Sequence, residues 1–273
     1  MSLTSAYRSL TAEQKQILDS KTVDLNRKVD ELIELLQPIA KFDALVGKGK
    51  TTLGCSIALL VMATIITLFV LPSPFRFIVP VALIACLFFV VKKYTLASKL
   101  DVSDNLGGFA LPMLKLLRDD FRPDAPMHLH LDLRLPTSKE KSTGAGEPHK
   151  AGAYYKIIDT TYQDDWFSGE GVLTDGSRFR WTVEETIRES KKSKKTPRGK
   201  YKTKTKYKKK ASIDVEIVLK KKTYDVDGAA KESEKSATMR VSKKFVQSSI
   251  DPIPLDPMLE AVAGIYAAAK PAK

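Results

Sequence analysis

The sequence predicts an α+β membrane protein, and three observations lead to that fold class. An almost uncharged block, Leu53 to Val91, is 39 residues long and contains one charged side chain, Arg76. Alternating apolar and polar residues recur between residues 126 and 250, as in β-strands. The segment from Arg188 to Lys222 holds 16 Lys and Arg against three acidic residues, so its net charge of +13 equals that of the whole chain. One soluble domain could not bury the apolar block, so the composition excludes a purely soluble protein.

These features divide the chain into five predicted parts. We expect an N-terminal amphipathic helix, a two-helix transmembrane hairpin, a juxtamembrane helix, a cytoplasmic antiparallel β domain built as a sandwich or open barrel, and an alanine-rich C-terminal helix. The ranges are 1–50, 51–93, 94–125, 126–250 and 251–273, and a basic arm occupies 187–210.

The apolar block predicts two membrane helices, at 53–71 and 75–91. The first has 19 residues, about 28 Å of helix, which is enough for a hydrocarbon core. Pro72-Ser73-Pro74 breaks the block into a hairpin. The second helix is shorter, so a wedge that enters and leaves one leaflet stays an alternative. Lysines flank both outer ends, and the positive-inside rule then places the N- and C-termini in the cytoplasm of a two-pass protein. They are Lys41, Lys48, Lys50, Lys92, Lys93 and Lys99.

The N-terminal region predicts a helix from Thr11 to about Val46. Leu18, Leu25, Leu32 and Ile39 lie seven residues apart, which is the spacing of a coiled-coil seam. This spacing predicts a homo-oligomer formed through the N-terminal helix. Additional apolar residues widen the stripe, so an amphipathic helix packed on its own domain remains an equal alternative.

Six mostly antiparallel strands are predicted in the β domain. Met127 to Leu135 alternates strictly between apolar and polar residues. A polar linker is expected at 137–152, and Asp175-Gly176 marks a hairpin turn. The strands are expected at 127–135, 153–162, 166–174, 178–189, 201–219 and 237–246.

The basic arm has a predicted register. Pairing residues whose numbers sum to 396 places Phe179 opposite Ile217 and Trp181 opposite Val215, and leaves Pro197-Arg198-Gly199 as a three-residue loop. Gly199 suits the left-handed position of such a loop. The same register places Lys192 opposite Lys204, a repulsive pair, so we expect the isolated hairpin to fray unless an anionic partner orders it.

Anionic lipid head groups, an acidic protein surface and nucleic acid are all candidate partners of this arm. Tyr201 and Tyr207 are candidates for base stacking. The alternative to a binding arm is a solvent-exposed run of like charges that has no specific partner. The candidate anion-binding residues are Lys191, Lys192, Lys194, Lys195, Arg198, Lys200, Lys202, Lys204, Lys206, Lys208 and Lys210.

The sequence suggests no reaction and no cofactor, so we expect a non-enzymatic anchoring or scaffolding protein. A membrane-tethered nucleic-acid binder and a pore-forming or transporter-accessory subunit are the alternatives. His128, His130 and Asp132 lie at alternate positions of one strand and form a weak candidate metal site of a hydrolase. The hydrolase run they resemble has a histidine where this chain has Leu133. Both cysteines, Cys55 and Cys86, lie in the apolar block and predict no disulfide framework.

Overall fold

A computed structural model of the chain describes residues 3–226 and 231–272. The chain divides into two compact units. The first contains the residues up to Ser20 together with Pro38–Val102, and the second contains Lys21–Gln37 together with the residues from Ser103 onward. Each unit is described in turn.

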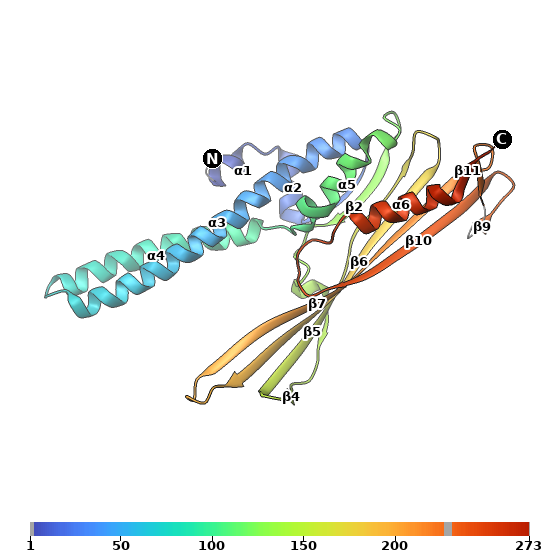
Figure 1. The fold of residues 1–273 in the computed structure, drawn as a ribbon. Helices are drawn as coiled ribbons and strands as arrows, with labels where there is room; N and C mark the ends of the chain where they lie inside the picture. The colour runs from blue at the N-terminus through green and yellow to red at the C-terminus, as the bar shows by residue number, and fades with distance from the viewer. Residues whose placement is uncertain (1–2, 227–230, 273) are drawn as a thin grey trace. The chain divides into compact units, whose positions relative to one another are not determined.

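The first unit is helical. Short helices α1 (Leu3–Arg8) and α2 (Ala12–Ser20) precede two long ones, α3 (Val29–Val70), whose first turns belong to the second unit, and α4 (Phe75–Leu100). A capping box begins α2, because the Thr11 hydroxyl accepts from the Gln14 backbone N–H and the Gln14 amide oxygen accepts from the Thr11 N–H. Helices α3 and α4 form a hairpin (Figure 1).

Both long helices are long and apolar enough to cross a membrane. The most apolar window of α3 has none of its residues buried, and that of α4 has 6% buried. Phe69 at the end of α3 is 79% exposed, and Val81 in α4 is 67% exposed. A core helix of a soluble domain would bury such side chains. The predicted spans at 53–71 and 75–91 lie within these longer helices, apart from Leu71, which follows the end of α3.

An ion pair joins the two helices at the base of the hairpin. The Lys50 ammonium lies 2.7 Å from a carboxylate oxygen of Asp101, the C-cap residue of α4. The Asp43 carboxylate accepts a hydrogen bond of 3.1 Å from the backbone N–H of Val102. These contacts hold together segments more than 50 residues apart in the sequence.

The predicted continuous helix from Thr11 to Val46 is wrong. Strand β1 (Thr22–Arg27) separates α2 from α3, and Lys21 has a positive φ of 56° where α2 ends. Leu25 lies in that strand, and Leu18, Leu32 and Ile39 are fully buried in the chain's own fold. The structure therefore contradicts the continuous helix on which the coiled coil was predicted, and the homo-oligomer expected through that helix stays a prediction.

The second unit is built on one antiparallel sheet. In the described residues it contains nine strands in the order β1-β2-β5-β6-β7-β10-β9, and β3 and β4 also pair with β5. Strands β8 and β11 form a separate two-stranded sheet. The strands are β2 (Met127–Asp132), β3 (Ser142–Ala145), β4 (His149–Ala151), β5 (Tyr154–Val172), β6 (Arg178–Lys195), β7 (Tyr201–Lys220), β8 (Tyr224–Val226), β9 (Lys231–Glu232), β10 (Ser236–Gln247) and β11 (Ala269–Pro271).

The sheet corrects three predictions. It is a single open sheet and neither a sandwich nor a barrel, because its strand order runs from one edge to the other without closing. The strands predicted at 153–162 and 166–174 are one strand, β5, whose register shifts between Asp165 and Phe167. The predicted linker at 137–152 contains a 3₁₀ turn (Lys139–Lys141), β3 and β4.

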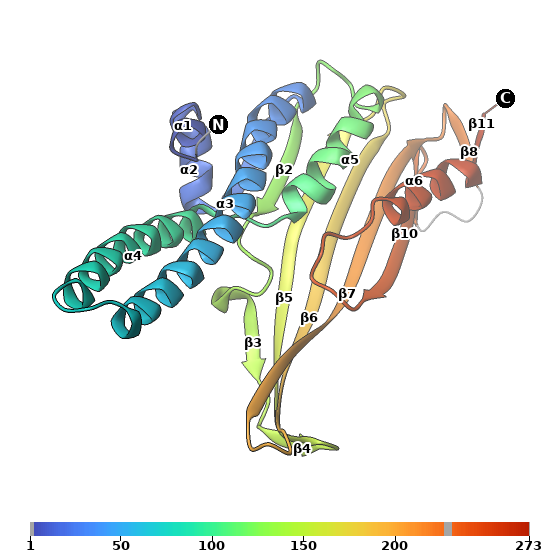
Figure 2. The ribbon, with the colours of Figure 1, turned by 60° about the vertical axis from the view of Figure 1, so that its left-hand side comes forward.

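Helices cover one face of the sheet. The predicted juxtamembrane helix is divided into a π-helical turn (Leu106–Ala110), α5 (Leu111–Leu116) with Pro112 in its first turn, and a 3₁₀ turn (Arg118–Asp120). The predicted C-terminal helix is α6 (Asp256–Ala268). Helices α5 and α6 lie on the same face of the sheet (Figure 2).

Aromatic rings fill the core between these helices and the sheet. Trp166, Phe167 and Trp181 from the strands and Phe109 from the π-helical turn are almost fully buried. The Phe109 ring lies edge-on to the rings of Trp166 and Phe167, with centroids 5.8 and 6.0 Å apart. Such pairs add to the large apolar area that these side chains bury. The core fixes the proximal halves of β5, β6 and β7, which continue beyond it as the basic arm.

Candidate functional site: a three-stranded basic arm

The basic arm consists of three strands. Strand β5 pairs with β6 as far as Lys156 opposite Ser193, and β6 pairs with β7 along its whole length. The predicted register is confirmed, since Phe179 lies opposite Ile217 and Lys192 opposite Lys204. The third strand supports the like-charged hairpin that we expected to fray alone. The distal part of the arm is visible in Figure 2 beyond the helices of this unit.

The turn at the tip of the arm is the predicted three-residue loop. The backbone N–H of Thr196 donates to the Lys200 carbonyl at 2.8 Å, and the N–H of Gly199 donates to the Thr196 carbonyl at 2.9 Å. Gly199 has a φ of +77°, the left-handed region that glycine adopts without steric cost. The turn therefore sets the register of the two strands.

One face of β7 carries a row of lysines, which we name the lysine face. Side chains along a strand alternate between its two faces, so residues with even numbers from 202 to 210 share one face. All five are exposed lysines without an ion-pair partner among the described residues, and neighbours in the row are about 6.6 Å apart along the strand. The lysine face consists of Lys202, Lys204, Lys206, Lys208 and Lys210.

Strand β6 adds three cations to the same side. Lys194 and Lys192 lie opposite Lys202 and Lys204. Arg188, opposite Lys208, is neutralised because its guanidinium lies 2.5 Å from the Asp159 carboxylate on β5. That arginine also holds the pKa of Asp159 below its usual value. Arg188 is thus the cation of this side that has an ion-pair partner among the described residues, and the lysines around it have none.

The distal half of β7 is an open edge of the sheet. Strand β10 pairs with β7 only from Lys209 to Lys220, so residues 201–208 have β6 as their one neighbouring strand in the described chain. Lysines on an exposed edge oppose edge-to-edge pairing with another copy. The face and edge together make an accessible cationic surface.

The opposite face of the arm has a different character. Tyr201 and Tyr207 lie there, on the odd-numbered side of β7. The Tyr201 ring packs against Tyr155, with centroids 5.6 Å apart. Burial and the nearby Glu189 carboxylate raise the pKa of Tyr207. Glu189 also lies 3.3 Å from Lys191. Because Tyr201 and Tyr207 are on this opposite face, the structure does not bring the predicted stacking residues onto the lysine face.

A buried group of charges lies at the base of the arm. Lys209 is fully buried, lies 3.4 Å from Glu185, and donates to the backbone carbonyl of Asp251. Lys141 lies 2.6 Å from Asp164. Burial raises the pKa of Asp164 to about 6 against the opposing attraction of Lys141, and burial also raises the pKa of Glu185. Burial lowers the pKa of Lys209.

Sequence reasoning missed this buried group. Lys209 belongs to the same lysine run as Lys208 and Lys210, so composition does not separate it from them. The predicted register could have separated it, because Lys209 lies opposite Ile187 on the face that also carries Ile213 and Val215. Asp164 lies inside β5, next to the boundary between the two strands predicted there.

The predicted metal residues are not brought together. His128 Nε2 lies 2.9 Å from an oxygen of Asp24 on β1, and His130 Nδ1 lies 3.6 Å from the other oxygen. Asp132 instead binds the Arg134 guanidinium at 2.6 Å. Within residues 3–226 and 231–272, no group of three His, Cys, Asp or Glu side chains could hold a metal ion.

No protein family model, no curated protein and no solved structure matches this chain. The assignment of a role therefore rests on the geometry of the arm and on the two apolar helices.

Proposed function

We propose that this protein is a non-enzymatic membrane anchor and scaffold whose lysine face binds the anionic head groups of a lipid bilayer. The observation that carries the proposal is the lysine face itself, five exposed lysines in a row without acidic partners among the described residues. The α3–α4 hairpin is the proposed anchor, with both termini in the cytoplasm.

The anchor is supported by the exposure of the apolar side chains of α3 and α4. Residues such as Phe69 and Val81 would face water in a soluble protein and would face acyl chains in a bilayer. Lysines at both outer ends of the hairpin favour the cytoplasmic orientation, because Arg76 is the one basic residue of the connecting region. The cytoplasmic leaflet is also the one that carries anionic lipid.

Electrostatics supports the docking of the arm on that leaflet. Each lysine brought near an anionic surface contributes about 1 kcal/mol. The hairpin anchor would already hold the arm near the bilayer, so binding would be effectively intramolecular and would need little affinity of its own. Phosphates between neighbouring lysines would also relieve the repulsion of pairs such as Lys192 and Lys204.

Lipid is favoured over nucleic acid by the placement of the aromatic residues. A single-stranded nucleic acid would use cations and stacking rings on one surface. Here Tyr201 and Tyr207 lie on the opposite face of β7 from the five lysines. The two predicted stacking rings are thus separated from the five lysines, and a row of point charges suits phosphate head groups on a flat surface.

A pore is disfavoured by the composition of the hairpin. The most apolar windows of α3 and α4 have mean hydropathies of 2.5 and 2.3 with at most two charged residues each. A conducting path needs polar groups that replace the hydration of an ion. We therefore assign the hairpin to anchoring.

A fluorophore at the tip of the arm tests this proposal in the full-length chain. A Pro197→Cys variant that also carries Cys55→Ser and Cys86→Ser would be labelled and reconstituted into nanodiscs whose lipid head groups carry a quencher. We expect quenching to rise when phosphatidylserine is mixed into phosphatidylcholine, and to fall in about 1 M salt, where the Debye length is about 3 Å. Equal quenching in neutral and anionic nanodiscs would contradict lipid binding and leave an acidic protein as the candidate partner.

A further inference from the structure

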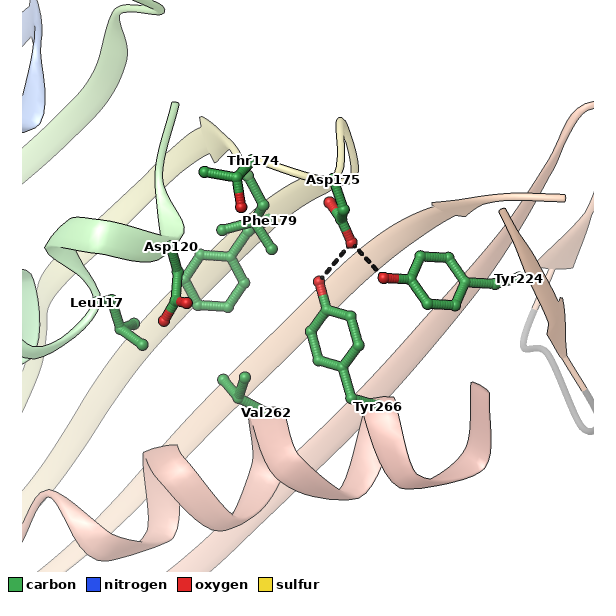
Figure 3. A pocket seen from close by; sticks show the side chains of 9 residues that line it. Leu117, Asp120, Thr174, Asp175, Phe179, Tyr224, Val262 and Tyr266 are labelled. Carbon is green, nitrogen blue, oxygen red and sulfur yellow. Dashed lines mark hydrogen bonds between the residues drawn. The ribbon is translucent and has the colours of Figure 1, made fainter. Parts of the chain in front are cut away.

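A cavity of about 340 Å³ lies in the second unit, which we call the β-rich unit. It is at the end of β5 and β6 that is opposite to the tip of the arm. Helix α6, the turn between β5 and β6, and the 3₁₀ turn after α5 surround it (Figure 3). Its volume is in the range of small-molecule sites, which is roughly 300–1,000 Å³. The residues that matter for its chemistry are Asp120, Asp175, Phe179, Tyr224, Val262 and Tyr266.

Two carboxylates give the cavity a negative charge. No Lys or Arg is among the described residues that line it. The phenols of Tyr224 and Tyr266 donate to the same Asp175 oxygen at 2.9 and 3.1 Å, and the Ser177 N–H donates to the other oxygen at 2.7 Å. Although burial opposes ionisation, these hydrogen bonds hold the pKa of Asp175 below its ordinary value. The exposed Asp120 carboxylate has no ion-pair partner in the described chain.

Aromatic rings line the cavity beside the two carboxylates and can attract a cation through their faces. Tyr224 and Tyr266 lie edge to face, with ring centroids 6.0 Å apart, and the Phe179 ring closes the sheet side of the cavity. A phenol that donates its proton to a carboxylate has a more electron-rich ring, which strengthens attraction for a cation over its face. Burial and the Asp175 carboxylate raise the pKa of Tyr266, so the phenol keeps the proton that it donates.

We propose that this cavity binds a small organic ammonium ion, with its charged nitrogen between the Asp120 carboxylate and the tyrosine rings and its alkyl groups against Val262 and Phe179. A neutral ligand of the same shape would forgo the two carboxylates, and an anion would be repelled by them. A hydrated metal ion would gain nothing from the apolar walls. Charge and apolar lining thus select the same class of ligand.

Choline and its neutral isostere 3,3-dimethylbutan-1-ol test the inference without any mutation. Isothermal titration of the full-length chain in an uncharged maltoside detergent should show saturable binding of choline, with the isostere weaker by about tenfold or more. Equal affinity for the two compounds, or no saturable choline binding, would overturn the proposal.

A matched pair of variants locates the site. Asp120→Asn removes one charge from the cavity, whereas Asp119→Asn removes one from the adjacent residue, which does not line it. Both side chains are exposed, so neither change should unfold the protein. We expect Asp120→Asn to weaken choline binding about fivefold or more and Asp119→Asn to leave it within about twofold. Equal losses in the two variants would place the binding elsewhere and overturn the assignment.

Discussion

Lys192 lies directly opposite Lys204 across β6 and β7, and neither ammonium group has an acidic partner among the described residues. Like charges at opposed positions destabilise a strand pair. The pairing persists in the structure because β5 extends along β6 as far as Ser193 and because the loop at Gly199 fixes the register. The arm therefore carries a repulsion that a bound anion would remove.

Reversing one charge of this pair should stabilise the arm. In Lys204→Glu, the new carboxylate lies opposite Lys192, and we expect the arm to gain about 0.5–1 kcal/mol of local stability. Hydrogen exchange of the β6 and β7 amides, measured for the full-length chain in uncharged detergent, reports this gain as slower exchange. Lys220→Glu is the control, because it makes the same charge change outside the arm. Faster or unchanged exchange in Lys204→Glu would show that the repulsion is unimportant.

The loop at the tip should tolerate asparagine better than alanine at position 199. Gly199 has a φ of +77°, and a side chain there would meet no atom within 4 Å, so the cost of substitution is conformational. We expect Gly199→Ala to destabilise the distal arm by about 1 kcal/mol and Gly199→Asn to lose less, because asparagine adopts the left-handed region more readily. Exchange of the arm amides measures both. Equal losses would mean that the backbone angle does not limit this turn.

A methyl group at position 169 should disrupt the core beneath the arm. A Cβ on Gly169 would lie 2.4 Å from Trp181 and 2.8 Å from the His128 carbonyl oxygen. We expect Gly169→Ala to lower the free energy of unfolding by about 2–3 kcal/mol, since a buried ring and a backbone must both move. The control is Gly264→Ala in α6, where a Cβ meets nothing within 4 Å and where alanine favours the helix. Denaturant unfolding followed by tryptophan fluorescence should separate the two variants, and a stable Gly169→Ala protein would refute this packing.

Asp164 should make the stability of the β-rich unit depend on pH. Burial raises its pKa from the ordinary 3.8 to about 6, so between these values the folded protein keeps a proton that the unfolded chain has lost. Stability should then fall as the pH rises through this window, by at most about 3 kcal/mol for this group. Glu185, whose pKa burial also raises, acts in the same direction.

Asp164→Asn should flatten this pH dependence. The measurement is denaturant unfolding of the full-length chain at several pH values between 4 and 7, with Asp165→Asn as the control, because Asp165 is adjacent and exposed. The control should keep the slope of the natural protein. An unchanged slope in Asp164→Asn would show that this carboxyl group ionises normally in the folded state.

The arm could be predicted from the sequence because two local signals agree. Alternation along residues 178–219 and the Pro-Arg-Gly loop select one register between them, and the structure has that register. The N-terminal helix was mispredicted because Leu25, one position of the seven-residue spacing, also fits a strand in which Val23 and Leu25 share one face. Their partner strand β2 lies about 100 residues away, so only the folded chain decides between the two patterns. The register shift in β5 between Asp165 and Phe167 likewise interrupts the alternation of the sequence, so one strand was predicted as two.

The candidate site was predicted in composition but only partly in arrangement. The sequence identified the cations of the arm, yet it treated Lys209 and its neighbours alike. The face of the sheet that α6 covers decides which lysines of β7 are exposed, because α6 packs against one face of β7 and leaves the other open. That long-range packing buries Lys209 and leaves Lys208 and Lys210 exposed.

The most direct test of the lysine face compares two variants that lose the same charge. In the first, the five lysines of the lysine face are changed to glutamine. In the second, the same change is made at five exposed lysines away from the lysine face in the β-rich unit that have no ion pair in the described chain, namely Lys139, Lys220, Lys222, Lys231 and Lys235. With the label at position 197 in anionic nanodiscs, we predict that head-group quenching is lost in the first variant and kept in the second. Equal quenching in both variants would contradict the claim that the lysine face binds the bilayer.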